Sequence, residues 1–304
     1  MQAHTQHPGF YFFERGWLSS NNVLLIDDDQ STLIDSGYAT HAEQTLALVQ
    51  HQLSGRALDR LINTHLHSDH CGGNSLLQKT FPNLSVGIPP GHFEAALLWD
   101  QEALTYLPTG QLCPRFVPDH VLLPGTEVRS GVYVWEVHAA PGHDPHSVVL
   151  FEPQLRWLIS ADALWGNGFG VVFPELEGIE AFDEVSATLD LIEKLAPTQV
   201  FPGHGAAFQD VSEALERARS RLDQFVSQPH KHTAYASKVL LKFKLMEFQS
   251  VSLSDFVTWA AQCSYLQLIK PHDQTDMQVW LLRVVDQLIQ SGAARKDGHR
   301  LINI

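Results

Sequence analysis

Apolar residues recur along the chain in short runs separated by polar or glycine-containing turns. The first run is aromatic, Phe10–Phe13. Two more, Val23–Ile26 and Thr32–Asp35, flank the polar segment Asp27–Gln30, and this pairing predicts a β-hairpin. Further apolar runs predict strands at Leu58–Asn63, Ser85–Ile88, Val132–His138, Ser147–Phe151, Arg156–Ser160 and Thr198–Phe201.

Other segments space their apolar side chains three or four residues apart, as on one face of a helix. The segment Glu180–Leu195 carries such a stripe, formed by Phe182, Val185, Leu189 and Ile192. A second helix is predicted over 40–53, with Thr40 as its N-cap and Glu43 as the capping-box partner three residues later. A charged amphipathic helix is predicted over 209–230.

After residue 230 the pattern becomes mainly helical, with helices predicted over 234–248, 252–262 and 275–291. Two short arms then surround Asp297-Gly298, a dipeptide typical of hairpin turns. We therefore expect a main domain over 1–230 and a small winged-helix-type domain over 231–304. Such domains can bind DNA, and the arms carry Arg295, Lys296 and Arg300. On an acidic chain we favour packing, or a place at the rim of a binding site.

The composition is acidic, with 20 Lys+Arg against 34 Asp+Glu and a formal charge of −14 over 304 residues. Such a surface repels the phosphates of nucleic acids and of anionic membranes, so neither is expected as a partner. No apolar run reaches the length of a membrane span, and Met1–Pro8 shows no signal-peptide core. Cys71, Cys113 and Cys263 are widely spaced and odd in number. They favour a reducing compartment, and we expect a cytoplasmic location.

The densest cluster of chemically active side chains lies in Thr64–Gly73, which reads Thr-His-Leu-His-Ser-Asp-His-Cys-Gly-Gly. A predicted strand precedes it and a predicted helix follows, so it lies at a strand end, where α/β folds place their sites. In an extended segment His65 and His67 project to one side and can bind one metal ion. Asp69 and His70 follow in the turn, where they can face a second ion. Imidazole and carboxylate suit zinc, and also iron or manganese.

A lone histidine is usually a surface or core residue, and a His-rich tract can bind metal without specificity. Here the strand before the cluster and the Gly-Gly turn after it distinguish the segment from such a tract. The run from His65 to His70 resembles the HxHxDH signature of the metallo-β-lactamase-fold hydrolases. That superfamily includes glyoxalase II thioesterases, lactonases and several nucleases. The resemblance implies that three later turns supply the remaining ligands in a fixed order.

Three later strand ends match that order. His143 follows Pro-Gly and is implied to join His65 and His67 on the first ion, while Asp162 is implied to bridge both ions. His204, in the turn Pro-Gly-His-Gly, is implied to complete the second set. The expected metal ligands are His65, His67, Asp69, His70, His143, Asp162 and His204. Asp69 is also expected to be catalytic, orienting the attacking nucleophile.

The chain departs from the family pattern at two of these turns. After His143, where the family more often has Thr-Pro-Gly or Thr-Pro-Ser, it has Asp144-Pro145-His146-Ser147. Asp144 could hold a ligand histidine from behind, and His146 is expected to be an ordinary hydrogen-bonded histidine. Around Asp162, Ala161 replaces glycine and Trp165 replaces phenylalanine.

Other segments near the site are expected to shape it. The resemblance implies that Asp35 lies close to the metals without binding them. Gly166–Gly170 carries three glycines and indicates either a loop over the substrate or a tight turn. Asp100–Asp119 has mixed polarity and three prolines, and we expect an irregular insertion that covers the site.

The resulting prediction is an α/β fold, a metallo-β-lactamase αββα sandwich with a small, mainly helical C-terminal domain. Its function is metal-dependent hydrolysis of an ester, thioester or lactone by hydroxide held on two divalent ions, zinc first and manganese or iron as alternatives. Two other functions stay open: a phosphodiesterase or nuclease with the same metals, and a mononuclear iron dioxygenase on the same fold. The expected partner is a small-molecule substrate, and a homodimer is left open.

Overall fold

The computed structural model describes residues 4–304, and two β-sheets form the framework of roughly its first 200 residues. The first sheet has seven strands in chain order: β1 (His4–His7), β2 (Phe10–Phe13), β3 (Asn22–Ile26), β4 (Ser31–Ile34), β5 (Arg60–Ile62), β6 (Ser85–Ile88) and β7 (His120–Val121). Strands β1 to β4 pair antiparallel, and β4 to β7 pair parallel. The hairpin predicted around Asp27–Gln30 is therefore confirmed, as the turn between β3 and β4.

The second sheet has five strands in the order β12-β11-β10-β9-β8. These are β8 (Glu127–Ser130), β9 (Tyr133–Ala139), β10 (Val148–Glu152), β11 (Trp157–Ala161) and β12 (Gln199–Pro202). Only β11 and β12 pair parallel, which leaves their carboxyl ends side by side at one edge of the sheet. This arrangement matters for the site, because Asp162 directly follows β11 and His204 closely follows β12.

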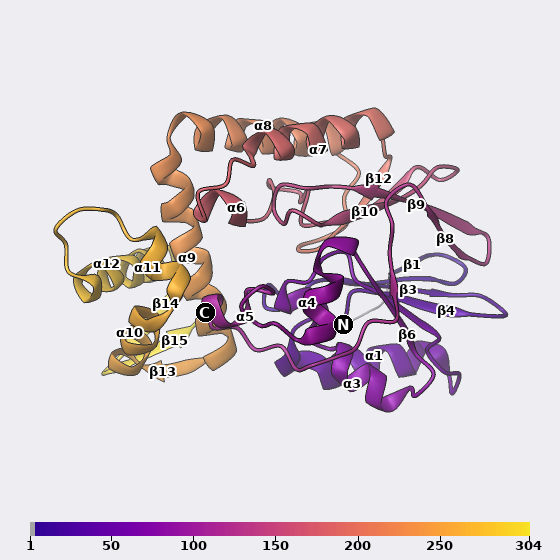
Figure 1. Ribbon diagram of the computed structural model, residues 1–304, viewed down its shortest axis with the longest axis horizontal. Helices are drawn as coiled ribbons and strands as arrows, with labels where there is room; N and C mark the ends of the chain where they lie inside the picture. Colours follow the sequence, from indigo (N-terminus) through magenta and orange to yellow (C-terminus); the bar gives the residue numbers. More distant parts are fainter. Residues whose placement is uncertain (1–3) are drawn as a thin grey trace.

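The two sheets face each other, with helices on their outer sides (Figure 1). Helices α1 (Ala42–Leu53) and α3 (Asn74–Thr80) cover the first sheet, and α7 (Phe182–Leu195) and α8 (Val211–Ser227) cover the second. An aromatic core fills the space between the sheets, where Phe10 lies against Trp135, Trp157 and Phe201. The predicted αββα sandwich is confirmed.

The predicted start of the first helix differs from the observed one. The predicted capping box at Thr40 is wrong, because residues Ala39–His41 form a 3-10 turn, and α1 begins only at Ala42 without a side-chain cap. The backbone at Gly37 adopts a φ of 77° and leads straight into that turn. Short helices not predicted from the sequence are α2 (Ser68–Cys71), α5 (Tyr106–Thr109), α6 (Phe173–Leu176) and α11 (Ser264–Ile269). A further short helix, α4 (Phe93–Leu98), follows the 3-10 turn η2 (Pro90–His92).

The C-terminal part begins with the long helix α9 (Pro229–Phe248), which runs from the end of α8 to the smaller body in Figure 1. Helices α10 (Leu253–Gln262) and α12 (Met277–Gln290) follow, and a small sheet has the order β13-β15-β14. Its strands are β13 (Ser250–Ser252), β14 (Ala294–Asp297) and β15 (Arg300–Asn303). The hairpin around Asp297-Gly298 is confirmed, joining β14 to β15.

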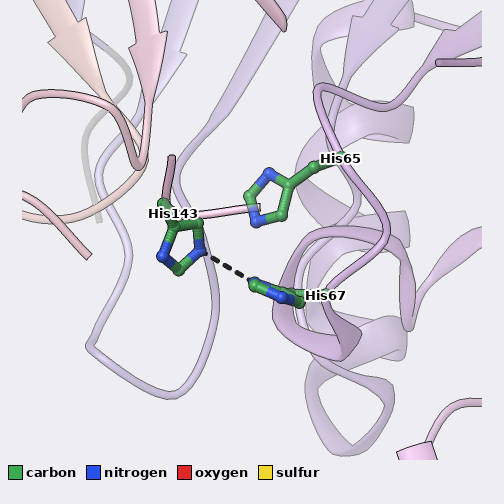
Figure 2. A group of neighbouring side chains, drawn as sticks. All are labelled: His65, His67 and His143. Atoms are coloured by element: carbon green, nitrogen blue, oxygen red, sulfur yellow. Dashed lines mark hydrogen bonds between the residues drawn. The ribbon is translucent and has the colours of Figure 1, made fainter. Parts of the chain in front are cut away.

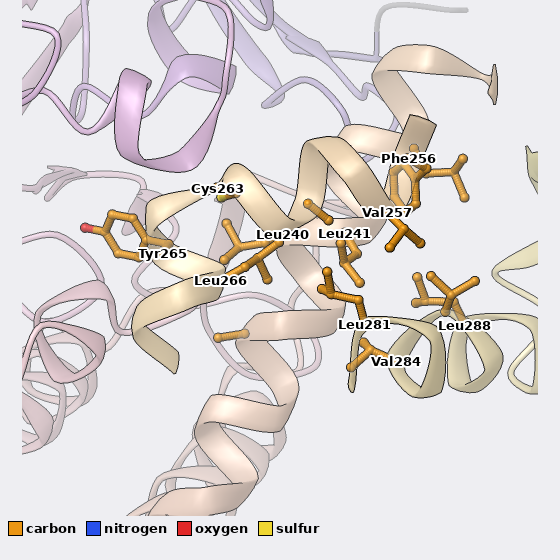
Figure 3. Packing of buried hydrophobic residues seen from close by; sticks show 14 of the residues in the cluster. Leu240, Leu241, Phe256, Val257, Cys263, Tyr265, Leu266, Leu281, Val284 and Leu288 are labelled. Carbon is orange, nitrogen blue, oxygen red and sulfur yellow. The ribbon is translucent and has the colours of Figure 1, made fainter. Parts of the chain in front are cut away.

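One hydrophobic cluster holds this part together, with Leu241, Phe256, Leu266 and Leu281 among its members (Figure 3). Val171 and Leu176, which precede α7, pack in the same cluster. The domain boundary at residue 230 therefore stays a prediction, because the packing crosses it. Within the described residues, no helix combines the length and apolarity that a bilayer span requires.

Candidate metal centre

Four segments that are distant in sequence meet at one edge of the sandwich. Each follows the carboxyl end of a strand: the His65–His70 segment follows β5, His143 follows β9, Asp162 follows β11, and His204 follows β12. Asp69 and His70 lie on the single turn of helix α2, which redirects their side chains away from the face used by His65 and His67. All seven predicted ligands come together, in two groups.

The first group contains His65, His67 and His143, each offering a nitrogen within 4.8 Å of the others. Their rings converge from two segments of the chain, and His67 Nδ1 lies 2.8 Å from His143 Nε2 (Figure 2). His143 Nδ1 donates to the carbonyl of Val171 at 2.6 Å, so its Nε2 faces the group as an unprotonated acceptor. His65 Nε2 is fully buried and makes no hydrogen bond to any described residue.

The second group contains Asp69, His70, Asp162 and His204, again within 4.8 Å of one another. His204 Nε2 lies 3.0 Å from Asp69 Oδ2, and His70 Nε2 lies 3.3 Å from Asp162 Oδ1. Asp162 also faces the first group, since its Oδ2 is 3.5 Å from His143 Nε2. A carboxylate between two ligand groups has the position that a bridging ligand needs.

Asp35 supports this arrangement from behind. Its carboxylate accepts hydrogen bonds from the Thr64 amide at 2.9 Å and the Thr64 hydroxyl at 2.8 Å. The same carboxylate lies 2.8 Å from His70 Nδ1, which leaves His70 Nε2 directed at the second group. His70 Nε2 is buried without a hydrogen bond within the described chain. The buried, unpartnered His65 Nε2, and His70 Nε2 with only a carboxylate oxygen at 3.3 Å, fit a metal ion as the missing partner.

The histidines of the two groups differ in the direction of their pKa shifts. Burial, with neighbouring imidazoles, lowers the pKa of His65 well below its ordinary value and lowers the pKa of His67 to about 4. Both rings are therefore neutral at pH 7, the form that coordinates metal. Burial would also lower the pKa of His70, but the carboxylates of Asp162, Asp35 and Asp69 outweigh it and raise that pKa well above normal. Such concentrated negative charge is what a divalent cation would balance.

Comparison with known families decides the assignment. The sequence profile of the Metallo-beta-lactamase superfamily matches residues 15–204, a span that contains all seven of these side chains. The chain belongs to the metallo-beta-lactamase superfamily. It is accordingly a metallo-hydrolase of that superfamily.

Similar proteins include hydrolases of related sequence and a solved structure of the same fold. It is 32% identical to a hydroxyacylglutathione hydrolase of Rippkaea orientalis over 162 residues, 51% of this chain and 54% of that one. It is 26% identical to the probable metallo-hydrolase YqjP of Bacillus subtilis, over 64% of this chain and 70% of that one. A solved metallo-beta-lactamase family protein from Thermus thermophilus aligns over 99% of this chain and 100% of its own, with a TM-score of 0.59 and 18% identity.

The candidate metal centre of this superfamily member opens into a cavity of about 420 Å³. Asp69, Asp162 and His204 lie on one side of it, and residues of helix α9 lie on its wall. The insertion predicted to cover the site contributes Thr105, Thr109 and Gln111 to the lining. The part played by α9 was predicted only as a general role at the rim, because no motif marks it.

The departures from the family pattern have local consequences. Trp165 donates its indole Nε1–H to Asp162 Oδ1 at 3.2 Å, a bond that phenylalanine could not make. Ala161 has a φ of 46°, in the left-handed region that glycine enters without strain. Asp144 Oδ2 lies 3.9 Å from His67 Nε2, too far for a hydrogen bond. The ring of His146 packs against His92 and belongs to neither group.

Two further residues border the centre: Trp17, which the sequence did not single out, and Gly170, from the predicted glycine loop. Trp17, 56% exposed, stacks on His204 with ring centroids 5.3 Å apart. Gly170 approaches His143 so closely that an added Cβ would lie 2.3 Å from its Nδ1. Gly170 therefore lies directly against a proposed ligand histidine, and the role of Gly166–Gly170 over a substrate stays a prediction. A positive φ, 107°, occurs at Gly168.

Proposed function

We propose that the protein hydrolyses a small carbonyl substrate, an ester, thioester or lactone, with two divalent metal ions. The observation that carries this proposal is the pair of ligand groups with Asp162 facing both, at the wall of a cavity of about 420 Å³. That volume falls in the range of small-molecule sites. The thioesterase named among its relatives supports a carbonyl substrate.

The residues present fit two ions, with His65, His67 and His143 for one and Asp69, His70 and His204 for the other. Asp162 would bridge them. Zinc is our first choice, with manganese or iron as alternatives, because the donors are imidazole nitrogens and carboxylate oxygens. When bound, such ions supply a Lewis acid for the carbonyl oxygen and an acidic water near neutral pH.

We assign Asp69 to accept the hydrogen bond of the attacking water. It lines the cavity, and burial would raise its pKa, but His70 and His204 outweigh burial and lower it. Asp69 is therefore a carboxylate at neutral pH, able to accept a hydrogen bond from the attacking water and to hold its orientation. His204 Nε2 lies 3.0 Å from that carboxylate, so the two side chains would bind the same ion.

A cysteine nucleophile is not part of this mechanism. Cys71 follows His70 in sequence but is fully buried, and burial together with Cys113 raises the pKa of its thiol well above normal. Its sulfur lies 3.2 Å from the Tyr106 hydroxyl, inside the packing below the first sheet. The protonated thiol is a poor nucleophile at neutral pH.

The nuclease alternative finds little support in the cavity. Lys238 and Lys242 are its only lysine or arginine lining residues, whereas a nucleic-acid strand needs a series of cations along its backbone. In the predicted wing, Arg300 hydrogen-bonds to Ser250, and Arg295 lies 3.6 Å from Asp297. These cations are engaged within the protein itself.

A substrate panel tests the proposal. Purified wild type, Asp69→Asn and Asp28→Asn proteins are assayed on matched thioesters, esters, lactones and phosphodiesters, with metal content measured in each sample. We expect carbonyl hydrolysis by wild type, a loss of about 100-fold or more in kcat for Asp69→Asn, and no loss for Asp28→Asn, whose side chain is exposed. Hydrolysis of phosphodiesters alone, or full activity in Asp69→Asn, would overturn it.

A further inference from the structure

Helix α9 presents one face to the cavity. Most of its cavity-lining residues follow at intervals of three or four, the spacing of a single helix stripe. The stripe consists of Tyr235, Lys238, Val239, Lys242, Phe243 and Met246. Ala236, Leu241 and Leu245 lie on the remaining faces and pack in the C-terminal cluster, where Figure 3 labels Leu241. The wall that α9 contributes is therefore backed by a packed core, which holds it in position.

Most of this wall is apolar. Val239, Phe243 and Met246 share the stripe, and Phe173 adds an aromatic ring that also contacts His67, with centroids 4.8 Å apart. An apolar group placed against this wall would be removed from water, which favours its binding. The cavity therefore favours a substrate with an apolar segment next to its reacting carbonyl.

The two lysines of the stripe differ in their surroundings. Lys242 Nζ donates to the Ala293 carbonyl at 2.6 Å, Asn303 Oδ1 at 2.6 Å and the Ile304 carbonyl at 2.9 Å. Lys238, one turn earlier, makes no hydrogen bond or ion pair with any residue in the described range 4–304, although it is partly buried. Among the cavity's two lysines, only Lys238 keeps its charge available for a ligand.

A lysine whose charge is free to bind a ligand stands out in this acidic protein. The chain carries 34 Asp+Glu against 20 Lys+Arg, so its average field repels anions. An anionic group entering this cavity would need a local cation to offset that repulsion, and a charge-assisted hydrogen bond to an ammonium group supplies it.

We propose that the substrate is an amphipathic anion: a carbonyl compound whose apolar segment packs on the α9 stripe and whose carboxylate binds Lys238. This inference rests on the proposed hydrolase function and narrows its substrate class. In this proposal Lys238 binds the substrate, whereas the ligand residues hold the metal ions.

Turnover of matched thioesters gives the first test. In the first pair of thioesters, a six-carbon acyl chain ends either in a carboxylate or in a neutral methyl ester. In the second pair, the same two end groups are placed on the thiol part of the substrate instead. We expect wild type to prefer the anionic member of at least one pair by about tenfold in kcat/KM. Lys238→Met should abolish that preference, and Lys238→Arg should keep it. Lys231→Met removes a lysine of the same helix that does not line the cavity, and it should also keep the preference.

A binding experiment separates this inference from the hydrolase proposal. The fluorescent apolar anion 8-anilino-1-naphthalenesulfonate is titrated into wild type and the three variants without any turnover. We expect its Kd to rise about tenfold in Lys238→Met and to stay near the wild-type value in Lys238→Arg and Lys231→Met. Absence of hydrolysis with this binding pattern would contradict the proposed function alone. Equal binding by wild type and Lys238→Met, or hydrolysis without anionic preference, would overturn the substrate class.

Discussion

Gly170 shows how one missing side chain preserves the centre. An alanine Cβ at this position would lie 2.3 Å from His143 Nδ1, where that nitrogen donates to Val171. We predict that Gly170→Ala displaces His143 and lowers zinc affinity by about 10- to 100-fold, as changes around ligand histidines do. Gly166→Ala is the matched control, because its nearest neighbour would be Phe208 at 3.9 Å. Chelator competition measures both, and equal affinities would remove the role assigned to Gly170.

Trp165 gives Asp162 a hydrogen-bond donor that the family's phenylalanine lacks. We predict that Trp165→Phe, which keeps an aromatic ring but loses the 3.2 Å bond to Oδ1, weakens metal binding by about tenfold. Trp17→Phe makes the same change on the neighbouring ring, which stacks on His204 and makes no hydrogen bond to Asp162. Its metal affinity should stay near that of wild type. A Trp165→Phe protein with unaltered affinity would show that the indole only fills space.

His232, on α9, makes stability depend on acid. It is buried, and its Nε2 accepts a hydrogen bond from the Val172 amide at 3.2 Å. Burial lowers the pKa of His232 to about 4 from an ordinary value of 6.5. The unfolded chain therefore binds the proton first as pH falls, so stability is full above pH 6.5 and declines between about 6.5 and 4. The decline from this group reaches about 3 kcal/mol.

The variant His232→Gln isolates that contribution, because glutamine can accept the same hydrogen bond but does not titrate. Urea unfolding of both proteins at several pH values between 7 and 4 measures it. We predict that the free energy of unfolding falls less steeply for the variant across this window. Parallel curves would show that His232 stays neutral in both states.

At the scale of residues, the pattern from His65 to His70 predicted metal ligands directly, and the family resemblance added His143, Asp162 and His204. The same resemblance implied that Asp35 lies near the metals, but it did not predict which atoms Asp35 contacts. The Asp35 contact to His70 crosses 35 positions, and the Trp165 bond depends on the rotation of an indole ring. Neither follows from local pattern, since each is set by how distant segments pack.

At the scale of elements, a partly buried polar network connects α9 to the metal-site side of the protein. Lys244 Nζ lies 2.8 Å from Glu247 Oε1 and donates to the Gly110 carbonyl at 2.8 Å. Tyr38 donates to Glu247 Oε2 at 2.5 Å and accepts a bond from the Leu112 amide at 2.9 Å. The network therefore joins α9 to the segment after α5 and to the turn that follows β4.

Breaking this network on one side should be costly. We predict that Lys244→Met lowers the free energy of unfolding by about 2 kcal/mol, because it leaves the partly buried Glu247 charged with Tyr38 as its remaining partner. The double variant Lys244→Met/Glu247→Leu should recover much of that loss. Arg219→Met, which removes an exposed ion pair with Glu193, should cost less than about 1 kcal/mol. Urea denaturation compares the three, and a single variant no worse than the double would contradict the network's role.

Element prediction succeeded where periodicity was long and failed where it was short. The stripe of α7 and the alternation in β9 were clear in the sequence, and both elements are present. The short strands β1, β7, β8 and β13 were missed, because at least half of the residues in each are polar and no apolar run separates them from a loop. The predicted cap at Thr40 failed because the approach of the preceding chain places this residue inside a 3-10 turn.

At the scale of the whole molecule, the two-layer sandwich and the convergence of four strand ends were anticipated through the family resemblance. The cavity was not, since its wall combines the loops of the metallo-beta-lactamase part with one stripe of α9. Substrate preference therefore depends on packing between distant parts of the chain. No motif in either part carries that information.

The central claim is that the two ligand groups hold two metal ions used for carbonyl hydrolysis. Its most direct test is elemental analysis of the purified protein, with thioester hydrolysis measured before chelation, after chelation and after zinc is restored. The account predicts close to two ions per chain, loss of hydrolysis when they are removed, and recovery as both return. A metal-free protein with full activity, or a single iron with oxygen consumption, would contradict it.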